Sequence, residues 1–252
     1  MTQLCQFTFH NVYNCLDVRK VNIFTEPNED TIAARNPYVT TGGQWAPESC
    51  VSYQKVAVII PYRNRLHHLR ILLNRLHPLL HKQQIDYRIF LVEQAGNDKF
   101  NRGKLMNVGF MEALKYDKYD CFVFHDADLI PEHDRNIYMC DDHVRQLSSA
   151  IDETRYQAQA AGLLLTRPPE HIGRFKMIRH TKASRSDNGY TAFLGWRGRW
   201  MNDGLNAPST MNYTVLSTTN MQLYTNVTVD LGPSKGHVID PEKDTTKESI
   251  WW

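Results

Sequence analysis

Three short runs of apolar residues, at 56–60 (VAVII), 87–94 (YRIFLVEQ) and 121–125 (CFVFH), each give way abruptly to polar residues. Their length and their content of β-branched and aromatic residues predict strands that are covered on both faces, as in a parallel sheet. Pro61 directly follows the first run, and we expect it to end that strand.

Leucines with helical spacing lie between the first two runs. The series Leu66, Leu69, Leu72, Leu73, Leu76 and Leu80 predicts a helix with one apolar face. A second helix is predicted over 103–115, with Leu105, Val108, Met111 and Leu114 on one face. Alternation of strand and helix predicts parallel strands joined by right-handed crossovers, and therefore an α/β fold.

The ends of the chain have a weaker pattern. Residues 1–50 show no sustained period and contain the turn-rich stretches EPNED and TTGGQWAPE, which predict an irregular N-terminal arm. Residues 51–252 are expected to form a single domain, although nothing after residue 145 clearly continues the rhythm of strand and helix.

A polar cluster follows each of the three predicted strands. The clusters are PYRNR (61–65), EQAGNDKFNRGK (93–104) and DAD (126–128). Ligands of open α/β sheets bind beyond the carboxyl ends of the strands. We therefore expect the three clusters to meet at one site.

Asp126 and Asp128 indicate a metal at that site. Two buried carboxylates repel each other unless a cation neutralises them, and their oxygen atoms suit magnesium or manganese. Such an ion usually also binds a substrate phosphate, whose remaining charge Arg63, Arg65 and Arg102 are placed to hold by forked hydrogen bonds.

Ordinary structural roles are the alternative for each of these residues. Acid pairs after strands often cap a loop or a helix, and a single arginine is usually a solvated surface charge. His125 fits a packed or surface position as well as a ligand. In GRFKMIRH (173–180), the spacing of Met177 and His180 is by itself more typical of core packing than of a site.

Composition narrows the class of protein only slightly. The chain has 252 residues, 42% of them hydrophobic, and a net charge of +2, which does not favour nucleic-acid binding. No apolar run approaches the ~18 residues that a membrane span needs. Five cysteines without CxxC spacing predict neither a disulfide scaffold nor a zinc site. Two sequons, Asn212-Tyr-Thr and Asn226-Val-Thr, favour a secretory compartment.

Five blocks of sequence, in this order, resemble the β-1,4-galactosyltransferase family. They are VAVIIPYRNR, FNRGKLMNVGF, CFVFHDADLIP, GRFKMIRH and MNDGLN. NPYVTTGGQWAPESCVS (36–52) and YTNVTVDLG (224–232) are also similar to the lead-in and closing strand of that family. The resemblance covers roughly residues 31–180 and 200–232.

The resemblance implies a GT-A-type α/β fold, with a mostly parallel central sheet and flanking helices, which makes residues 51–252 a glycosyltransferase catalytic domain. It also implies the Golgi lumen, behind an N-terminal membrane anchor that this chain does not show. The implied activity is transfer of galactose from UDP-galactose to N-acetylglucosamine-type acceptors in a β-1,4 linkage, with manganese as cofactor and inversion at the anomeric carbon.

Site residues follow from the same resemblance. Asp128, Met177 and His180 match the metal ligands, although a thioether on manganese is not what ligand softness predicts. The donor-nucleotide contacts match Pro61, Tyr62, Arg63, Arg65, Phe100, Arg102, Asp126 and Ala127. Tyr62 and Ala127 replace the usual Phe and Val, and both changes are mild.

The resemblance also implies disulfide bonds. Cys121 and Cys140 match one disulfide of the family. Cys50 matches half of another, whose partner here is either Cys5 or Cys15.

One segment of the family is missing. Between the Cys121–Cys140 block and GRFKMIRH, family members carry a glycine-rich segment, a Trp-Gly-Trp-Gly-Gly run and Glu-Asp-Asp-Asp. This chain has only AIDETRYQAQAAGLLLTRPPEH there and nowhere three consecutive acids, while GWRGRW (195–200) comes too late and lacks the acids. The fold is therefore expected to be truncated in its second half, without the acceptor platform and the catalytic base.

Two functions follow from this departure. The first is a manganese-dependent galactosyltransferase that transfers galactose weakly or not at all, since an absent base alone costs about 10²–10⁴-fold in rate. The second is a non-catalytic protein that binds UDP-sugar and metal, or pairs with a full-length relative.

A phosphohydrolase with an aspartyl nucleophile also carries Asp-x-Asp after an apolar strand. It would have its motif earlier, followed by a small hydroxyl residue, whereas Leu129 follows here.

Overall fold

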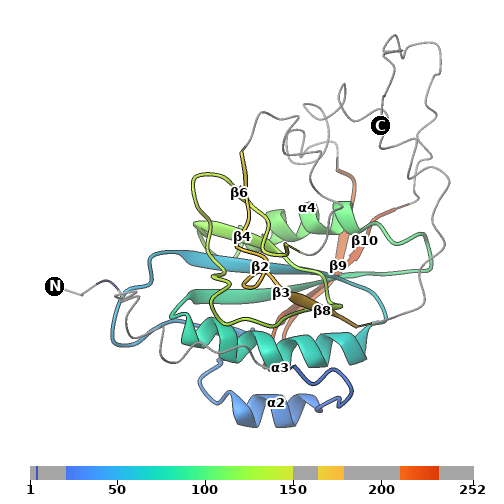
Figure 1. Cartoon of the computed structure of the whole chain (residues 1–252). Coiled ribbons are helices and arrows are strands. Elements are labelled where there is room, and N and C mark those ends of the chain that lie inside the picture. Colours follow the sequence, from blue (N-terminus) through green and yellow to red (C-terminus); the bar gives the residue numbers. More distant parts are fainter. Residues whose placement is uncertain (1–3, 5–20, 150–163, 179–210, 233–252) are drawn as a thin grey trace, which may run out of the picture.

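The computed structural model describes residue 4 and residues 21–149, 164–178 and 211–232. Six strands form the central sheet, in the order β4-β2-β3-β10-β9, with β1 beside β3 (Figure 1). Their bounds are β1 Gln44–Trp45, β2 Lys55–Tyr62, β3 Asp86–Gln94, β4 Cys121–Phe124, β9 Thr214–Asn220 and β10 Thr225–Asp230. Strands β4, β2, β3 and β10 are parallel, while β9 and β1 run antiparallel to their neighbours, which confirms the predicted parallel core.

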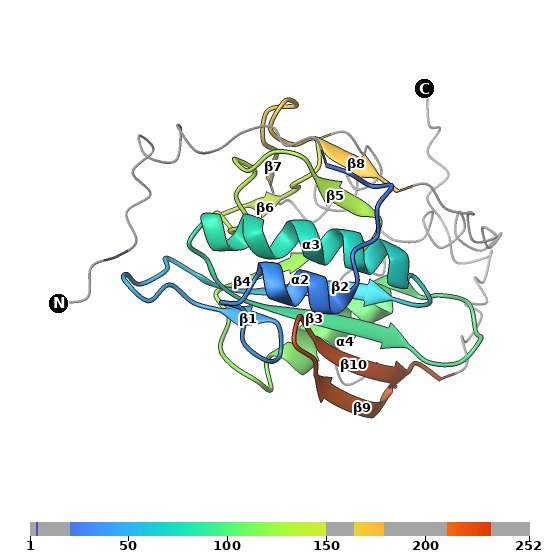
Figure 2. The ribbon, with the colours of Figure 1, turned by 90° about the horizontal axis from the view of Figure 1, so that it is seen from below.

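Helices cover both faces of this sheet. Helix α3 (Leu66–Lys82) packs on one face and α4 (Arg102–Ala113) on the other, and α2 (Glu29–Arg35) lies outside α3 (Figure 1). Two short strand pairs complete the described structure: β5 (Leu129–Pro131) with β8 (Phe175–Met177), and β6 (Val144–Arg145) with β7 (Leu165–Thr166). Figure 2 shows β5 and β8 on one side of α3, with β9 and β10 on the other side.

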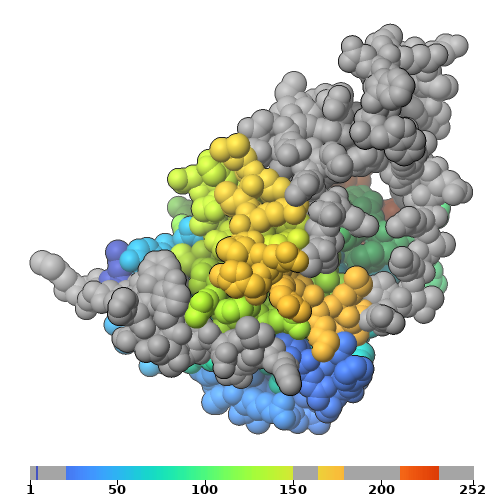
Figure 3. Space-filling view, in the orientation of Figure 1, coloured from blue at the N-terminus to red at the C-terminus, as the bar shows by residue number. Residues whose placement is uncertain are grey.

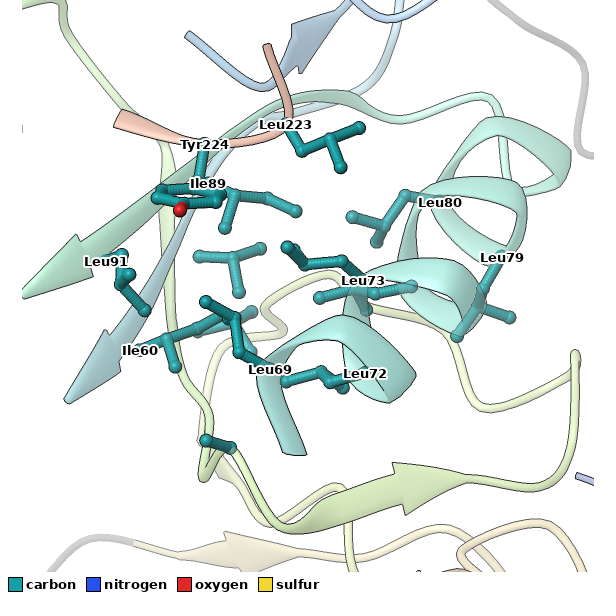
Figure 4. Packing of buried hydrophobic residues seen from close by; sticks show 14 of the residues in the cluster. Ile60, Leu69, Leu72, Leu73, Leu79, Leu80, Ile89, Leu91, Leu223 and Tyr224 are labelled. Carbon is teal, nitrogen blue, oxygen red and sulfur yellow. The ribbon is translucent and has the colours of Figure 1, made fainter. Parts of the chain in front are cut away.

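Alternation along the strands divides the core into two hydrophobic clusters. In β2, Val56, Val58 and Ile60 pack with α3, whereas Ala57 and Ile59 pack with α4. The predicted leucines of α3 are buried in the cluster on the α3 face except Leu66, which stands at the start of the helix and is 41% exposed. Figure 4 shows Leu69, Leu73 and Leu80 directed at the strands that carry Ile60, Ile89 and Leu91. Strand β2 is buried from Val56 to Tyr62 and β3 from Ile89 to Val92, which explains why these stretches are continuous apolar runs.

Two expectations about element ends are wrong. Pro61 lies inside β2, paired with Val92. The carbonyl of Ile59 accepts a hydrogen bond from the His125 N–H at 2.9 Å, so the backbone polar groups of Ile59 point toward β4. Because alternate residues of a strand direct their backbone groups to the same side, those of Pro61 also point toward β4. Because β4 ends at Phe124, the missing N–H of Pro61 costs no ladder bond. Leu114 does not join the apolar face, because α4 ends at Ala113 and leaves Leu114 47% exposed.

Part of the N-terminal arm is regular. Helix α2 and strand β1 lie between residues 29 and 45, and Ile32 is completely buried. Asn28 caps α2 by accepting a hydrogen bond from the Thr31 N–H at 2.8 Å. The expected irregular arm therefore contains ordered elements, while a single catalytic domain over 51–252 stays a prediction.

Gly109 sets the distance between α4 and the sheet, so we expect Gly109→Ala to destabilise the protein. A Cβ at this position would lie 2.4 Å from Ile59 Cγ2 and 2.8 Å from Val92 Cγ2. Overpacking of this kind costs about 1–3 kcal/mol. Gly103→Ala, in the same helix with no atom within 4 Å of its new Cβ, is the matched control and should stabilise by roughly 0.5–1 kcal/mol. Urea unfolding of both variants checks this, and equal midpoints would contradict it.

His77 makes the stability of the fold sensitive to acid. It is completely buried in α3, where its Nδ1 lies 2.8 Å from the Tyr87 hydroxyl and its Nε2 lies 3.0 Å from the Leu223 carbonyl oxygen. The carbonyl can only accept, so Nε2 carries the proton and Nδ1 accepts from Tyr87. Burial lowers the pKa of His77 to about 4.

The unfolded chain, in which the pKa of His77 is near 6.5, binds this proton first. Stability should therefore fall as the pH drops from about 6.5 to 4, by on the order of 3 kcal/mol from this group. Urea unfolding at pH 7 and pH 4.5 measures how much unfolding free energy is lost on acidification in the wild type, in His77→Gln and in the exposed-site control His143→Gln. This loss should become smaller only in His77→Gln. An unchanged loss in that variant would refute the claim that His77 is the acid-sensitive group.

Candidate functional site

The ends of β2, β3 and β4 meet, as the polar clusters predict. The β2–β4 ladder runs to Ile59↔Phe124 and continues with the His125 N–H to the Ile59 carbonyl. On its other side β2 pairs with β3 up to Tyr62↔Glu93. The segment after β4, which carries Asp126 and Asp128, therefore begins beside the last residues of the central strand.

Arg102 and Asp126 form an ion pair across this edge. Arg102 Nε lies 2.7 Å from Asp126 Oδ1 and joins the first residue of α4 to the segment after β4. Burial raises the pKa of Asp126, although the adjacent guanidinium acts in the opposite direction. Half of the Arg102 side chain is exposed, which leaves N–H groups directed at solvent for an anionic ligand.

Arg63 and Phe100 form a second contact near this edge. The Arg63 guanidinium carbon lies 5.4 Å from the centre of the Phe100 ring, and Arg63 Nη1 donates to the Asp98 carbonyl. Asn64, the next residue, adopts a left-handed φ of 51°, and this turn separates β2 from α3. The guanidinium lies over the face of a ring that is itself 38% exposed, so the cation and the ring can both contact a planar ligand.

The other predicted donor residues have different surroundings. Pro61, Tyr62 and Ala127 are buried, and the latter two belong to the hydrophobic cluster on the α3 face. Burial raises the pKa of Tyr62. Arg65 precedes α3, where its carbonyl accepts a hydrogen bond from the Leu69 N–H at 2.9 Å. The three buried residues form the end of the strand. The predicted donor arginines and Phe100 provide polar and aromatic groups at the surface.

Two of the three predicted metal ligands lie at one end of the β5–β8 pair. Met177 pairs with Leu129, the residue after Asp128, and the Ile178 N–H donates to the Asp128 carbonyl at 2.9 Å. Figure 3 shows residues 164–178, in yellow-orange, spread over the yellow-green segment that includes β5. Met177 is 54% exposed, and His180 lies outside the described residues. No three His, Cys, Asp or Glu side chains within the described ranges come together as a metal site.

His125 is a packed residue. It is buried next to Tyr138, whose hydroxyl lies 2.9 Å from His125 Nε2, and its Nδ1 lies 2.9 Å from the Asp126 carbonyl oxygen. Burial lowers the pKa of His125 to about 4. The neutral ring thus contacts the backbone of Asp126. Of the roles considered for His125, which were a packed or surface residue and a ligand, the structure favours a packed residue.

Sequence analysis missed a buried ionic cluster that holds the loop after β5. Asp134 is completely buried, with its carboxylate 2.5 Å from Arg75 Nη2 and 2.9 Å from Lys82 Nζ. Arg75 also donates to the Pro131 carbonyl at 2.8 Å, and Gln83 Nε2 donates to the Asp134 carbonyl at 2.9 Å. Arg75 and Lys82, seven residues apart on α3, were the available signal, because that spacing puts both on one helix face.

The predicted Cys121–Cys140 disulfide is confirmed, with a Cα–Cα distance of 5.5 Å. It closes a loop that contains both aspartates. Cys50 is disulfide-bonded as well, while Cys5 and Cys15, the two partners considered for it, lie outside the described residues.

Comparison with known proteins decides the family. The family model for the N-terminal region of glycosyl transferase group 7 matches residues 7–141. Beta-1,4-galactosyltransferase 4 of Cricetulus griseus is 36% identical over 245 residues, which cover 80% of this chain and 70% of that protein. The chain belongs to the β-1,4-galactosyltransferase family. The predicted enzyme class, a hexosyltransferase, is thereby confirmed.

Other relatives agree. Beta-1,4-galactosyltransferase 1 of Mus musculus is 37% identical over 247 residues, which cover 81% of this chain and 61% of that protein. The crystal structure of the catalytic domain of Drosophila β1,4-galactosyltransferase 7 in complex with xylobiose has a TM-score of 0.54 at 19% identity, and covers 70% of this chain and 93% of that chain. This likeness confirms the predicted fold class. No described helix has both the length and the apolar character to cross a membrane.

Loss of the Cys121–Cys140 disulfide should weaken the fold of this galactosyltransferase homologue. Closing a loop of 19 residues stabilises a protein by about 3 kcal/mol in the chain-entropy account. We expect the double variant Cys121→Ser/Cys140→Ser to lose about that much in urea unfolding at pH 7. The single variant Cys140→Ser keeps the buried sulfur of Cys121 and should lose a similar amount. Wild-type stability in the single variant would mean that packing of Cys121, and not loop closure, carries the effect.

Proposed function

We propose that this chain binds UDP-galactose with Mn²⁺ at the carboxyl ends of β2, β3 and β4, and that it transfers galactose to an N-acetylglucosamine-type acceptor weakly or not at all. The observation that carries the proposal is the meeting of the Asp126–Asp128 segment with Arg102 and the end of β2 at one sheet edge. The compartment proposed for it is the Golgi lumen.

The donor would be held by side chains from three strand ends. Arg102 already makes a charge-assisted hydrogen bond to Asp126 and has exposed N–H groups for a diphosphate. Arg63 and Phe100 are suited to the planar part of the nucleotide. Pro61, Tyr62 and Ala127 would form the floor, with Arg65 at the side. A solved Drosophila β1,4-galactosyltransferase 7 mutant in complex with manganese, UDP-Gal and xylobiose has a TM-score of 0.51 with this chain.

The metal would be held by Asp128, Met177 and His180. The residues present fit this role in part, because the β5–β8 pairing brings Met177 next to the backbone of Asp128. The carboxylate oxygen of Asp128 is a ligand that Mn²⁺ prefers. When bound, Mn²⁺ would neutralise charge on the nucleotide diphosphate. Asp126, paired with Arg102, would then position that arginine and would not bind the ion.

Weak or absent transfer is supported by the alignments with relatives. The match to the Cricetulus griseus protein has 245 positions, whereas 80% of this chain is about 202 residues, so roughly 43 aligned positions have no counterpart here. The sequence resemblance puts the acceptor platform and the Glu-Asp-Asp-Asp run between the Cys121–Cys140 block and GRFKMIRH, where this chain has only a short segment. Without a base near the acceptor hydroxyl and a surface to orient the acceptor, both proximity and proton transfer are lost.

Calorimetry with UDP in the presence and absence of Mn²⁺ tests the donor half. We expect Mn²⁺ to tighten UDP binding in the wild type, and Asp128→Asn to reduce that gain by at least tenfold. Asp142→Asn removes the same charge from an exposed position and should bind as the wild type does. Equal affinities with and without Mn²⁺ in the wild type would reject the proposed metal site.

A radiolabelled transfer assay with UDP-galactose and N-acetylglucosamine separates the two remaining functions. With the full-length Mus musculus relative as reference, we expect a rate at least about 10²-fold lower for this chain. Binding without any transfer selects the non-catalytic alternative, a donor-binding variant or partner of a full-length relative. A rate equal to the reference would refute the loss of the acceptor and base machinery.

A further inference from the structure

The two sequons of the chain have opposite structural surroundings. Asn212 and Asn226 both stand in an Asn-x-Thr motif with a residue other than proline in the middle. We propose that Asn212 is an N-glycosylation site of the folded protein and that Asn226 is not. The inference rests on the proposed luminal location, since the modification takes place in the secretory pathway.

Asn226 is held inside the sheet. Strand β10 lies between β3 and β9, and Asn226 pairs with Leu91 on one side and Thr219 on the other. Its neighbour Val227 belongs to the cluster under α4, so by strand alternation Asn226 faces the opposite side of the sheet, which α3 covers.

The amide of Asn226 is engaged on that side. Its Nδ2 lies 3.4 Å from Glu93 Oε2 and 3.3 Å from Thr228 Oγ1, and its Oδ1 is buried. Thr228, the hydroxyl residue of the sequon, donates to the same Glu93 oxygen at 3.2 Å. A sugar on Nδ2 would displace Glu93 and stand between β10 and the helix layer. A folded chain therefore excludes a glycan at Asn226.

Asn212 lies at the outer edge of the sheet, directly before β9. Its main chain is anchored, because Lys104 Nζ donates to its carbonyl at 2.6 Å and the hydroxyl of the next residue, Tyr213, donates to Glu112 at 2.6 Å. Tyr213 packs against the cluster under α4, and the residues on either side of it, Asn212 and Thr214, are exposed. The acceptor amide and the sequon hydroxyl thus both point away from the core.

The modification needs only a donor that the secretory pathway supplies, an oligosaccharide linked to a lipid pyrophosphate. The Asn212 amide nitrogen forms the new bond to the anomeric carbon and loses one proton. The bond between that carbon and the lipid pyrophosphate breaks, and the pyrophosphate leaves with the bonding electrons. Nothing is oxidised or reduced, and the glycan projects into solvent beside the N-terminal turn of α4.

Expression of the full chain behind a cleavable secretion signal in a eukaryotic cell tests the inference, with intact mass measured before and after a peptide-N-glycosidase. Because the signal enforces luminal entry, the result does not depend on the natural location. Cell-retained and secreted protein are both measured, so that poor secretion does not remove the readout. We expect one glycan on the secreted wild type, none on Asn212→Gln, and one on Thr214→Ser, which keeps the sequon.

Asn226→Gln should carry the same single glycan as the wild type. The inference is overturned by an unglycosylated wild type, by a glycan that persists in Asn212→Gln, or by secreted folded protein that loses a glycan in Asn226→Gln. Calorimetry of the deglycosylated protein with UDP and Mn²⁺ is a separate readout, so failure of the donor site and failure of the glycan site are distinguishable.

Discussion

The parallel register of β4 on β2 determines where the charged groups of the candidate site lie. Strand β4 stops opposite Ile59, three residues before β2 itself ends at Tyr62. The chain that leaves β4 is therefore released beside Pro61, which leaves no unpaired donor on that side. The segment with the two aspartates follows β4 at the edge of the sheet where α4 begins. Arg102, the first residue of α4, forms its ion pair with Asp126 there. A slip of one residue in this pairing would turn the side chains of β4 to the opposite faces of the sheet and would shift the segment that carries both aspartates along β2.

A second constraint acts on the segment after the aspartates. Helix α3 holds it by Arg75, Lys82 and Gln83, and the disulfide ties its end to the start of β4. Breaking one side of a buried ion pair costs more than the pair itself contributes, because the remaining charge stays desolvated. The cluster around Asp134 therefore specifies one path for the loop, and β5 is presented to β8 along that path.

Local sequence predicted the elements that depend on local physics. Apolar runs such as 56–60 and leucine spacing in α3 are consequences of burial on two faces of a strand or one face of a helix, so they can be read without the fold. Pro61 was misjudged because its tolerance depends on where a different strand ends. The pairing of β5 with β8, and the cluster around Asp134, depend on contacts between distant parts of the chain. The carboxylate of Asp128 indicated a metal by its chemistry, whereas Met177 and His180 came from resemblance alone, since their spacing is more typical of core packing.

The distribution of buried residues supports the proposal that a donor site persists without an acceptor platform. Between Tyr138 and Ile178, no described residue is a buried apolar member of either cluster. The sheet is instead completed by β9 and β10, which come late in the chain and pair onto β3. The strand ends that carry Arg63, Arg102 and Asp126 are thus fixed by a core to which the described residues of this interval add only partly buried side chains, those of Met139, Cys140 and Leu147. The proposed loss of the acceptor platform is therefore compatible with the packing that positions the predicted donor residues.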